Sequence, residues 1–282
     1  VGDVERLYVK FHKEAAEDEA LHDHSRDELR KLQAGDADNF ELWQLFRRSP
    51  QESFDSIYER LDVHFDVTYG ESHYNDQLGP LVERLLDQGI AEHSDGAVCV
   101  FFRDAQGEDE MTPFLIRKKD GASLYATTDL ATVELRLEEF AADRMIYVTD
   151  VRQKLHFNQL FATAAKMGIN AEFAHLGFGM MTLPEGAFST RQGNVIRLDE
   201  LLDEAERRAR ATQEQRVSDR GEEWTEEELS ELASTVGLGA LKYADLSNNP
   251  QSNIVFSFDK MLSFEGNTAP YLQYTSARTF SL

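Results

Sequence analysis

Apolar positions recur with a helical period over much of the chain. Residues 4–34 carry apolar side chains among many charges and predict a pair of exposed helices. Residues 40–61 predict a longer amphipathic helix that is interrupted at Ser49-Pro50, where a new first turn can begin. Further helices are predicted at 77–89, from Thr127 or Thr128 to Phe140, around 160–167, and at 198–210 and 236–243. The polar, acidic stretch 213–231 predicts a surface segment or a mobile stem.

Other segments have the composition or the alternation of β-strands. Residues 63–67 alternate like a strand, and two short β-like runs, 97–102 and 114–117, flank an acidic turn around Gly107. The two runs predict a hairpin-rich insertion over about 90–119. Residues 145–149 predict a buried strand, followed by a polar loop and a helix. That order is the unit that brings ligand contacts to the carboxyl end of a parallel sheet, so the predicted class is α/β.

Composition and charge narrow the class of protein. The 282 residues are 41% hydrophobic, which is enough for one large domain or two. The net charge of -23 comes from 52 acidic and 29 basic residues, with the acids spread along the chain. Such a surface repels nucleic acid in dilute salt, so RNA binding needs a local basic patch or high salt. An acid-rich, lysine-poor composition resembles that of proteins from salty cytoplasms, and an acidic protein from a high-GC genome has the same character.

The sequence also excludes several kinds of site and location. Cys99 is the only cysteine, which rules out an internal disulfide framework and any metal site built on a cysteine cluster. No apolar run approaches the roughly 20 residues that span a bilayer, and there is no signal peptide, so we predict a cytoplasmic protein without a membrane partner. The chain begins at Val1 without a methionine and ends within a helical pattern, which predicts an interior piece of a longer protein.

The first candidate site is the polar segment 188–194. Ser189 and Thr190 supply hydroxyl donors, Arg191 supplies one fixed cation, and Gly193 leaves the backbone free to close over a ligand. This set of groups suits a phosphate clamp. An ordinary solvated turn has the same composition, so the segment alone leaves both interpretations open.

The second candidate is the pair Tyr125 and Asp129. If the helix reaches back to Tyr125, the i, i+4 spacing brings the ring and the carboxylate to the same side. A planar ring beside a carboxylate suits a guanidinium, which needs hydrogen-bond acceptors in its plane and a flat surface against its face. In the alternative interpretation, Asp129 complements the helix dipole and Tyr125 packs against the protein.

Two further residues have open interpretations. Glu71 follows the predicted strand 63–67 just after a glycine, where side chains project into the crevice at strand ends, yet it is equally suited to cap the helix that follows. His156 follows the strand 145–149 and is a candidate general base, although a single histidine at a helix start is more often a structural hydrogen-bonding residue.

Five sequence blocks, and their order along the chain, resemble those of the arginyl-tRNA synthetases, a family of class I aminoacyl-tRNA synthetases. Residues 188–193 resemble the family's second signature loop, with Thr190 at the position of its second lysine. The other four blocks are the Glu71-Ser-x-Tyr-Asn segment, the Tyr125-x-Thr-x-Asp129-Leu-Ala motif, the run from Val148 to Phe157 that contains Gln153, and the His175-x-x-Phe178-Gly179 strand. In addition, the segments 240–247 and 266–274 resemble the family's junction with the helical anticodon-binding domain.

The resemblance implies an arginine–tRNA ligase, which activates L-arginine with ATP and transfers it to tRNA(Arg). It implies that Glu71, Tyr125, Asp129 and Gln153 hold the guanidinium. The adenine would lie beside His175, Phe178 and Gly179, and the triphosphate beside the catalytic loop residues Ser189, Thr190, Arg191 and Gly193. ATP is then a substrate, Mg²⁺ is bound through the nucleotide with no protein-bound metal cluster, and tRNA binds before arginine is activated.

The resemblance also implies a domain organisation. Residues 1–262 would form a Rossmann-like class I catalytic domain, incomplete at its N-terminus, with a small β-rich insertion and a helical stem from about 199. Residues 263–282 would begin an α-helical anticodon-binding domain. The first signature, His-x-Gly-His, occurs nowhere in the chain, so we expect it upstream and expect the chain alone to be an inactive monomer. The alternatives are a class I synthetase of other specificity, such as the cysteinyl enzyme, or a non-catalytic nucleotide- or RNA-binding paralogue.

Overall fold

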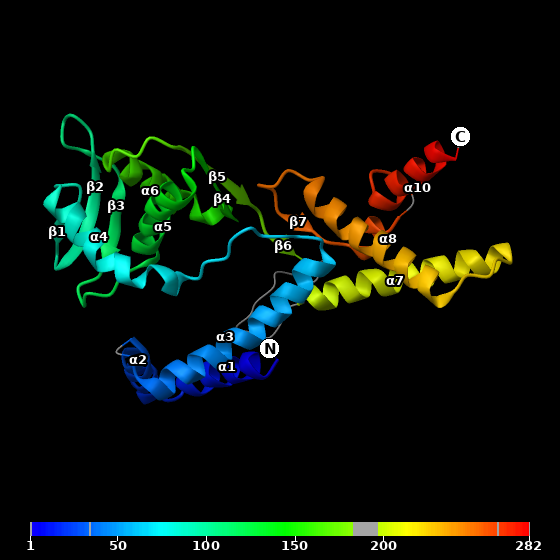
Figure 1. Ribbon diagram of the computed structural model, residues 1–282, viewed down its shortest axis with the longest axis horizontal. Coiled ribbons are helices and arrows are strands. Elements are labelled where there is room, and N and C mark those ends of the chain that lie inside the picture. The colour runs from blue at the N-terminus through cyan, green and yellow to red at the C-terminus, as the bar shows by residue number, and fades with distance from the viewer. Residues whose placement is uncertain (1, 34, 183–196, 264, 282) are drawn as a thin grey trace. The chain divides into compact units, whose positions relative to one another are not determined.

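The computed structural model describes residues 2–33, 35–182, 197–263 and 265–281. These residues form two compact units, each built from segments that are distant in sequence (Figure 1). The mixed unit consists of Asp66–Met181 and Asn248–Ile254 and contains helices and sheets. The helical unit consists of Val1–Phe65, Thr182–Ser247 and Val255–Leu282. The predicted start of a further domain at residue 263 is not tested by this division and stays a prediction.

The mixed unit has a single hydrophobic core, which two sheets and three helices share. Leu85 of α4, Ile116 of β3, Leu130 of α5 and Leu160 of α6 are all fully buried in it. The insertion is therefore part of the same packed body as the predicted strand–loop–helix unit. The elements are η1 (Glu71–Tyr74), α4 (Asn75–Asp87), β1 (Glu92–Ser94), β2 (Ala97–Arg103), β3 (Asp109–Arg117), α5 (Tyr125–Phe140), β4 (Arg144–Asp150), η2 (Val151–Gln153), α6 (Lys154–Lys166) and β5 (Glu172–Phe178).

The predicted hairpin insertion is confirmed as a three-stranded antiparallel sheet in the order β1-β2-β3. Its acidic turn is closed by Asp104, whose Oδ1 accepts hydrogen bonds from the backbone N–H groups of Gln106 at 2.8 Å and Glu108 at 2.9 Å. Gly107 in this turn has φ +88°, a left-handed conformation that glycine adopts without strain. Polar turn residues and two apolar runs were sufficient to predict this element.

The predicted strand at 145–149 is confirmed as β4, which pairs in parallel with β5. Met145 and Tyr147 face the core, while the alternate residues Ile146 and Val148 are 52% and 60% exposed. Their partners across the ladder, Ala174 and Leu176, continue the same open face. Parallel sheets are ordinarily covered on both faces. Within the described residues, this sheet is covered by helices on one face only.

The helical unit is built from long amphipathic helices. Arg60, the last residue of α3, forms ion pairs with Asp203 at 2.9 Å and Glu206 at 3.1 Å on α7. The predicted close packing of 236–243 is confirmed, because Gly237 of α8 lies directly against the backbone of Ala205 in α7. Its helices are α1 (Gly2–Ala15), α2 (Ala20–Gln33), α3 (Ala37–Arg60), α7 (Leu198–Arg220), α8 (Glu226–Leu246), α9 (Phe258–Met261) and α10 (Ala269–Phe280).

Two short strands, β6 (Met181–Thr182) and β7 (Ile254–Val255), form a two-stranded sheet. Just before β6, the backbone N–H of Gly179 donates to the carbonyl of Pro250 at 2.7 Å. A Cβ at Gly179 would lie 2.3 Å from the carbonyl oxygen of Ser252, so only glycine fits this close approach of two backbones.

Several predicted boundaries were wrong. Residues 63–67 do not form a strand, and the apolar side chains of Val63, Phe65 and Val67 are 38%, 59% and 44% exposed. An alternating segment forms a strand only when a neighbouring strand pairs with its backbone, and within the described residues none pairs with this one. Helix α3 continues through Pro50, although proline leaves one backbone carbonyl without its helical donor. Helix α7 runs ten residues beyond its predicted end at Arg210. The stretch 213–231 is mostly exposed, as predicted for a surface segment, but most of it is helical.

Candidate active site

A cleft of about 670 Å³ opens in the mixed unit between α5, β4 and the two short 3₁₀ turns. Its volume falls within the roughly 300–1,000 Å³ that is typical of small-molecule sites. Four predicted residues, Glu71, Tyr125, Asp129 and Gln153, line it together. The remaining lining residues are Tyr69, Tyr74, Thr128, Thr132, Arg136, Tyr147, Thr149, Arg152, His156 and Phe157.

The start of α5 determines how Tyr125 and Asp129 are presented. The helix begins at Tyr125, and its N-cap is Leu124, so the predicted cap at Thr127 or Thr128 was wrong. The hydroxyl of Thr127 is instead buried and donates to the carbonyl of Ile116 on β3, which ties the first turn to the hairpin sheet. Because the helix reaches back to Tyr125, Tyr125 and Asp129 are an i, i+4 pair on one side of α5, as the prediction required. The Tyr125 side chain is 70% exposed at the rim, and that of Asp129 is 31% exposed inside the cleft.

Glu71 and Gln153 reach the cleft from the two 3₁₀ turns. Glu71 begins η1, and the residue at the N-cap of α4 is Tyr74, so the helix-capping interpretation of Glu71 was wrong. Gln153 ends η2 and is the N-cap of α6, directly after the carboxyl end of β4. This is the position at which parallel strands present ligand contacts, as the strand–loop–helix pattern predicted.

Asp150 holds the turn that carries Gln153. Its Oδ1 accepts a hydrogen bond from the backbone N–H of Arg152 at 2.8 Å, and its carboxylate binds the Arg152 guanidinium through contacts of 2.9 and 2.7 Å. These hydrogen bonds from Arg152 hold the pKa of Asp150 below its usual value. Asp150 is therefore committed to the turn, and the carboxylates that line the cleft are those of Glu71 and Asp129.

Two aromatic side chains define the rim and the floor. At the rim, the Tyr69 ring stacks on His73 at 4.1 Å, and its hydroxyl donates to Glu139 at 2.7 Å. On the floor, Tyr147 is 7% exposed, and burial raises its pKa to about 12, although the nearby Arg136 guanidinium opposes the shift. The Tyr147 hydroxyl has no hydrogen-bond partner among the described residues. The Tyr147 hydroxyl is therefore neutral at physiological pH, and the Arg136 guanidinium lies 5.0 Å from the centre of its ring.

Asp129 has a partner that sequence reasoning did not assign. The Nε2 atom of His156 lies 2.6 Å from its Oδ2 atom. The contact shows that His156 is a hydrogen-bonding residue. Its other ring nitrogen, Nδ1, takes no part in this contact, so the general-base interpretation stays a prediction. Arg136 was also missed. It lies seven residues after Asp129 on α5, two helical turns further along the same face, and this spacing was the available signal.

The three predicted adenine-binding residues are on β5 and just after it. His175 packs on the core side, with its ring 4.7 Å from that of Phe157 and its Nε2 2.9 Å from the Thr149 hydroxyl. Burial lowers the pKa of His175. Phe178 is 45% exposed on the opposite face of the strand, and Gly179 lies against Ser252. The strand therefore separates His175 from Phe178, and their shared role stays a prediction.

The residues of the predicted phosphate loop, Ser189, Thr190, Arg191 and Gly193, lie outside the described residues. Among the residues that the structure does describe, no group of three or more His, Cys, Asp and Glu side chains is arranged to hold a metal ion. Nor does any helix in the described ranges combine the length and apolar character needed to cross a bilayer.

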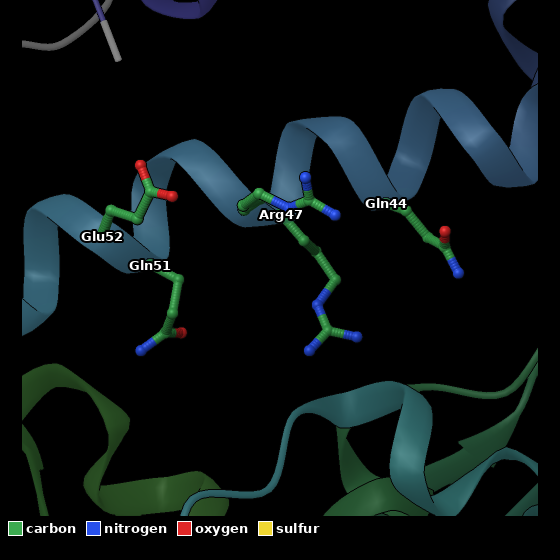
Figure 2. Close-up of a pocket in the computed structure, with 5 residues that line it drawn as sticks. Gln44, Arg47, Gln51 and Glu52 are labelled. Atoms are coloured by element: carbon green, nitrogen blue, oxygen red, sulfur yellow. The ribbon is translucent and has the colours of Figure 1, made fainter.

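A second hollow, of about 390 Å³, lies along α3 (Figure 2). Figure 2 shows its side chains projecting from one helix, without a converging second wall of labelled groups. Gln44, Arg47 and Glu52 among them are exposed polar residues. The hollow offers neither the partly buried carboxylate of Asp129 nor the aromatic floor of the cleft in the mixed unit, which is therefore the better candidate site.

The chain matches one family model over residues 1–258, that of the catalytic domain of class I tRNA synthetases (R). It is 47% identical to an arginine–tRNA ligase of Fusobacterium nucleatum, covering 100% of this chain and 48% of that protein. It is 43% identical to the arginine–tRNA ligase of Azotobacter vinelandii, covering 100% of this chain and 49% of that protein. The chain thus spans about half the length of these relatives.

Solved structures show the same fold. The arginyl-tRNA synthetase of Plasmodium falciparum superimposes with a TM-score of 0.76 and 27% identity, over 92% of this chain and 43% of that one. The Thermus thermophilus arginyl-tRNA synthetase superimposes with a TM-score of 0.69 and 24% identity, over 98% of this chain and 50% of that one. The α/β prediction for the catalytic fold is confirmed.

Proposed function

The chain belongs to the catalytic-domain family of class I arginyl-tRNA synthetases, and we propose that it is part of an arginine–tRNA ligase. The full protein would use ATP to activate L-arginine and would transfer the arginyl group to tRNA(Arg). Relatives named arginine–tRNA ligase favour this specificity over that of another class I synthetase. Because this chain covers only about half the length of those relatives, the proposed activity is that of the full-length protein and has to be tested with it.

One observation carries the proposal. Glu71, Tyr125, Asp129 and Gln153 come from three separate sequence blocks and line a single cleft. Two carboxylates, an aromatic face and an amide in one cleft form a receptacle for a planar cation. A guanidinium has five N–H donors in a fixed plane. Two carboxylates and the carbonyl oxygen of a glutamine side chain can accept hydrogen bonds from these donors. Tyr147 itself adds no charge to the cleft, whose two carboxylates are accompanied by the Arg136 and Arg152 cations.

The proposed chemistry has two steps. The carboxylate of bound arginine attacks the α-phosphorus of ATP in line, and pyrophosphate leaves, which gives arginyl-adenylate. The ribose hydroxyl at the 3′ end of tRNA then attacks the arginyl carbonyl, and AMP leaves. The attacking carboxylate is already ionised, so the first step needs no general base. The protein contributes mainly by positioning arginine against ATP and by stabilising charge on the phosphates.

The ATP side of the proposal rests on the sequence motifs. We propose that His175, Phe178 and Gly179 lie near the adenine and that the segment with Ser189, Thr190, Arg191 and Gly193 holds the triphosphate. Mg²⁺ would be carried mainly by the phosphates of the nucleotide, since it keeps water ligands and seldom uses an all-protein cage. We further propose that the enzyme acts as a monomer in the cytoplasm, where tRNA is charged for protein synthesis.

The test is charging of bulk tRNA by the full-length protein that contains this chain, with arginine, lysine, cysteine and glutamate supplied separately. We expect charging with arginine alone. Charging with a different amino acid would retain the class I chemistry but refute the guanidinium site. No charging with any of the four would instead favour the non-catalytic paralogue.

A further inference from the structure

The cleft contains a histidine–carboxylate pair that joins two helices. The Nε2 atom of His156, in the first turn of α6, lies 2.6 Å from Oδ2 of Asp129, in the second turn of α5. Their side chains are 27% and 31% exposed. An ionised carboxylate only accepts hydrogen bonds, so Nε2 carries the proton and donates it to Asp129. The contact therefore assigns the tautomer or charge state in which Nε2–H is present.

The histidine ring is held on two sides by aromatic side chains. Phe114 of β3, which is 3% exposed, packs edge-on against it with centroids 5.4 Å apart and an interplanar angle of 65°. Phe157, also 3% exposed, packs at 5.2 Å and 88°. Both rings belong to the core, which restricts rotation of the imidazole. The core thus fixes His156, and His156 in turn restrains the Asp129 carboxylate.

This restraint leaves one carboxylate oxygen for a ligand. Within the described residues, Oδ2 of Asp129 is engaged with His156, while Oδ1 has no hydrogen-bond partner. The Arg152 cation, which also lines the cleft, is taken by two hydrogen bonds to Asp150. A guanidinium binds well only when the acceptor oxygens lie in its plane. The orientation of the Asp129 carboxylate therefore governs how well a guanidinium is held.

We propose that His156 is a positioning residue for arginine selectivity, which sets the plane of the Asp129 carboxylate so that Oδ1 faces the substrate guanidinium. This inference rests on the proposed function, since it takes arginine as the ligand of the cleft. The role assigned to His156 is to hold the Asp129 carboxylate and not to act as the base of the first step, because the attacking carboxylate of arginine is already ionised.

The experiment compares His156→Ala and His156→Gln in tRNA charging by the full-length enzyme. An amide nitrogen of Gln can donate from about the position of Nε2, whereas Ala cannot. We expect His156→Ala to raise the KM for arginine about tenfold, the cost of a misplaced charged hydrogen bond, with kcat and the KM for ATP changed less than about twofold. His156→Gln should recover most of the arginine KM. His93→Ala, an exposed histidine on β1, is the matched control.

A double-mutant cycle separates positioning from a general structural effect. If His156 acts through Asp129, then His156→Ala should change the arginine KM less than about twofold in an Asp129→Asn background. An unchanged arginine KM in the single variant, or the same tenfold loss in both backgrounds, overturns the inference while wild-type charging with arginine leaves the proposed function intact. If the wild-type enzyme does not charge tRNA with arginine, the proposed function and this inference fail together.

Discussion

Tyr125 and Asp129 lie one helical turn apart at the start of α5, and both side chains line the same cleft. The ring stands at the exposed rim, and the carboxylate lies deeper, beside His156. A ligand that satisfies both must have a cationic end and a flat face. We propose that this combination discriminates a guanidinium from an ammonium by shape, and from a neutral urea group by charge.

The first prediction concerns that charge. Asp129→Asn in the full-length enzyme keeps the side-chain shape but removes the negative charge, so arginine should bind roughly 10- to 100-fold more weakly, as expected for a hydrogen bond between charged groups. Citrulline, which has a neutral urea in place of the guanidinium, should lose much less affinity. The measurement is competition by both compounds in tRNA charging. Asp143→Asn, an exposed acid before β4, is the control, and equal losses for the two compounds would exclude a charge-based role for Asp129.

The second prediction concerns the flat face. Tyr125→Phe keeps the ring, whereas Tyr125→Ala removes it. Because the ring is 70% exposed, its contact with a guanidinium should be worth only about 0.5–1 kcal/mol, so the alanine variant should raise the arginine KM roughly two- to fivefold and the phenylalanine variant should not. Charging kinetics at saturating ATP measure this. A loss that is as large in Tyr125→Phe would assign the effect to the hydroxyl and not to the ring.

Local pattern was sufficient to predict this part of the site. Tyr125 and Asp129 are four residues apart in one helix, so a helical period alone brings them together. The hairpin sheet was predictable for the same reason, since its strands and its turn at Gly107 adjoin in sequence. Local pattern also misled at residues 63–67, where the alternation is real but no strand in the described part of the chain pairs with it.

The rest of the site depends on contacts between distant residues. His156 and Asp129 are 27 residues apart and meet only because α5 and α6 pack on the same core. No periodicity in either helix predicts that contact. The open apolar face of Ile146 and Val148 was equally unpredictable, because a run of buried-type residues predicts a strand but not what covers each side of it. Such features follow from packing, which depends on tertiary structure.

The third prediction concerns the floor of the cleft. The Tyr147 hydroxyl is buried without a hydrogen-bond partner among the described residues, so Tyr147→Phe removes a polar group that is costly to bury. We expect the variant to be as stable as the wild-type chain or more stable by up to about 1 kcal/mol at neutral pH. Urea unfolding measures the difference. A loss of more than 1 kcal/mol would show that the hydroxyl has a stabilising partner in solution.

The same variant tests the pKa of Tyr147. Burial raises that pKa from 10.0 to about 12, so the unfolded chain releases this proton at lower pH than the folded protein does. Above pH 10 the unfolded state therefore binds fewer protons, and the stability contributed by this group is lost as the pH rises through about 12. The wild-type chain should lose stability between pH 10 and 12 more steeply than Tyr147→Phe. Parallel pH profiles would mean that Tyr147 ionises normally.

The last prediction concerns the packing of α7 on α8. A Cβ at Gly237 would lie 2.9 Å from the backbone carbon and oxygen of Ala205, and backbone atoms cannot rotate away as a side chain can. Alanine favours a helix over glycine by about 1 kcal/mol, whereas overpacking costs about 1–3 kcal/mol. Gly237→Ala should therefore destabilise the helical unit by up to about 2 kcal/mol, seen as faster hydrogen exchange of the amides in α7 and α8.

Gly70→Ala provides the matched control for adding a methyl group. Gly70 has φ -85° and ψ 164°, which alanine adopts without strain, and nothing lies within 4 Å of an added Cβ. Reduced freedom of the unfolded chain should make this variant slightly more stable, by about 0.4–1 kcal/mol. If Gly237→Ala left hydrogen exchange in α7 and α8 unchanged, α7 and α8 would be able to move apart by enough to admit the methyl group without a loss of stability. The close contact at Ala205 would then not be what requires glycine at position 237.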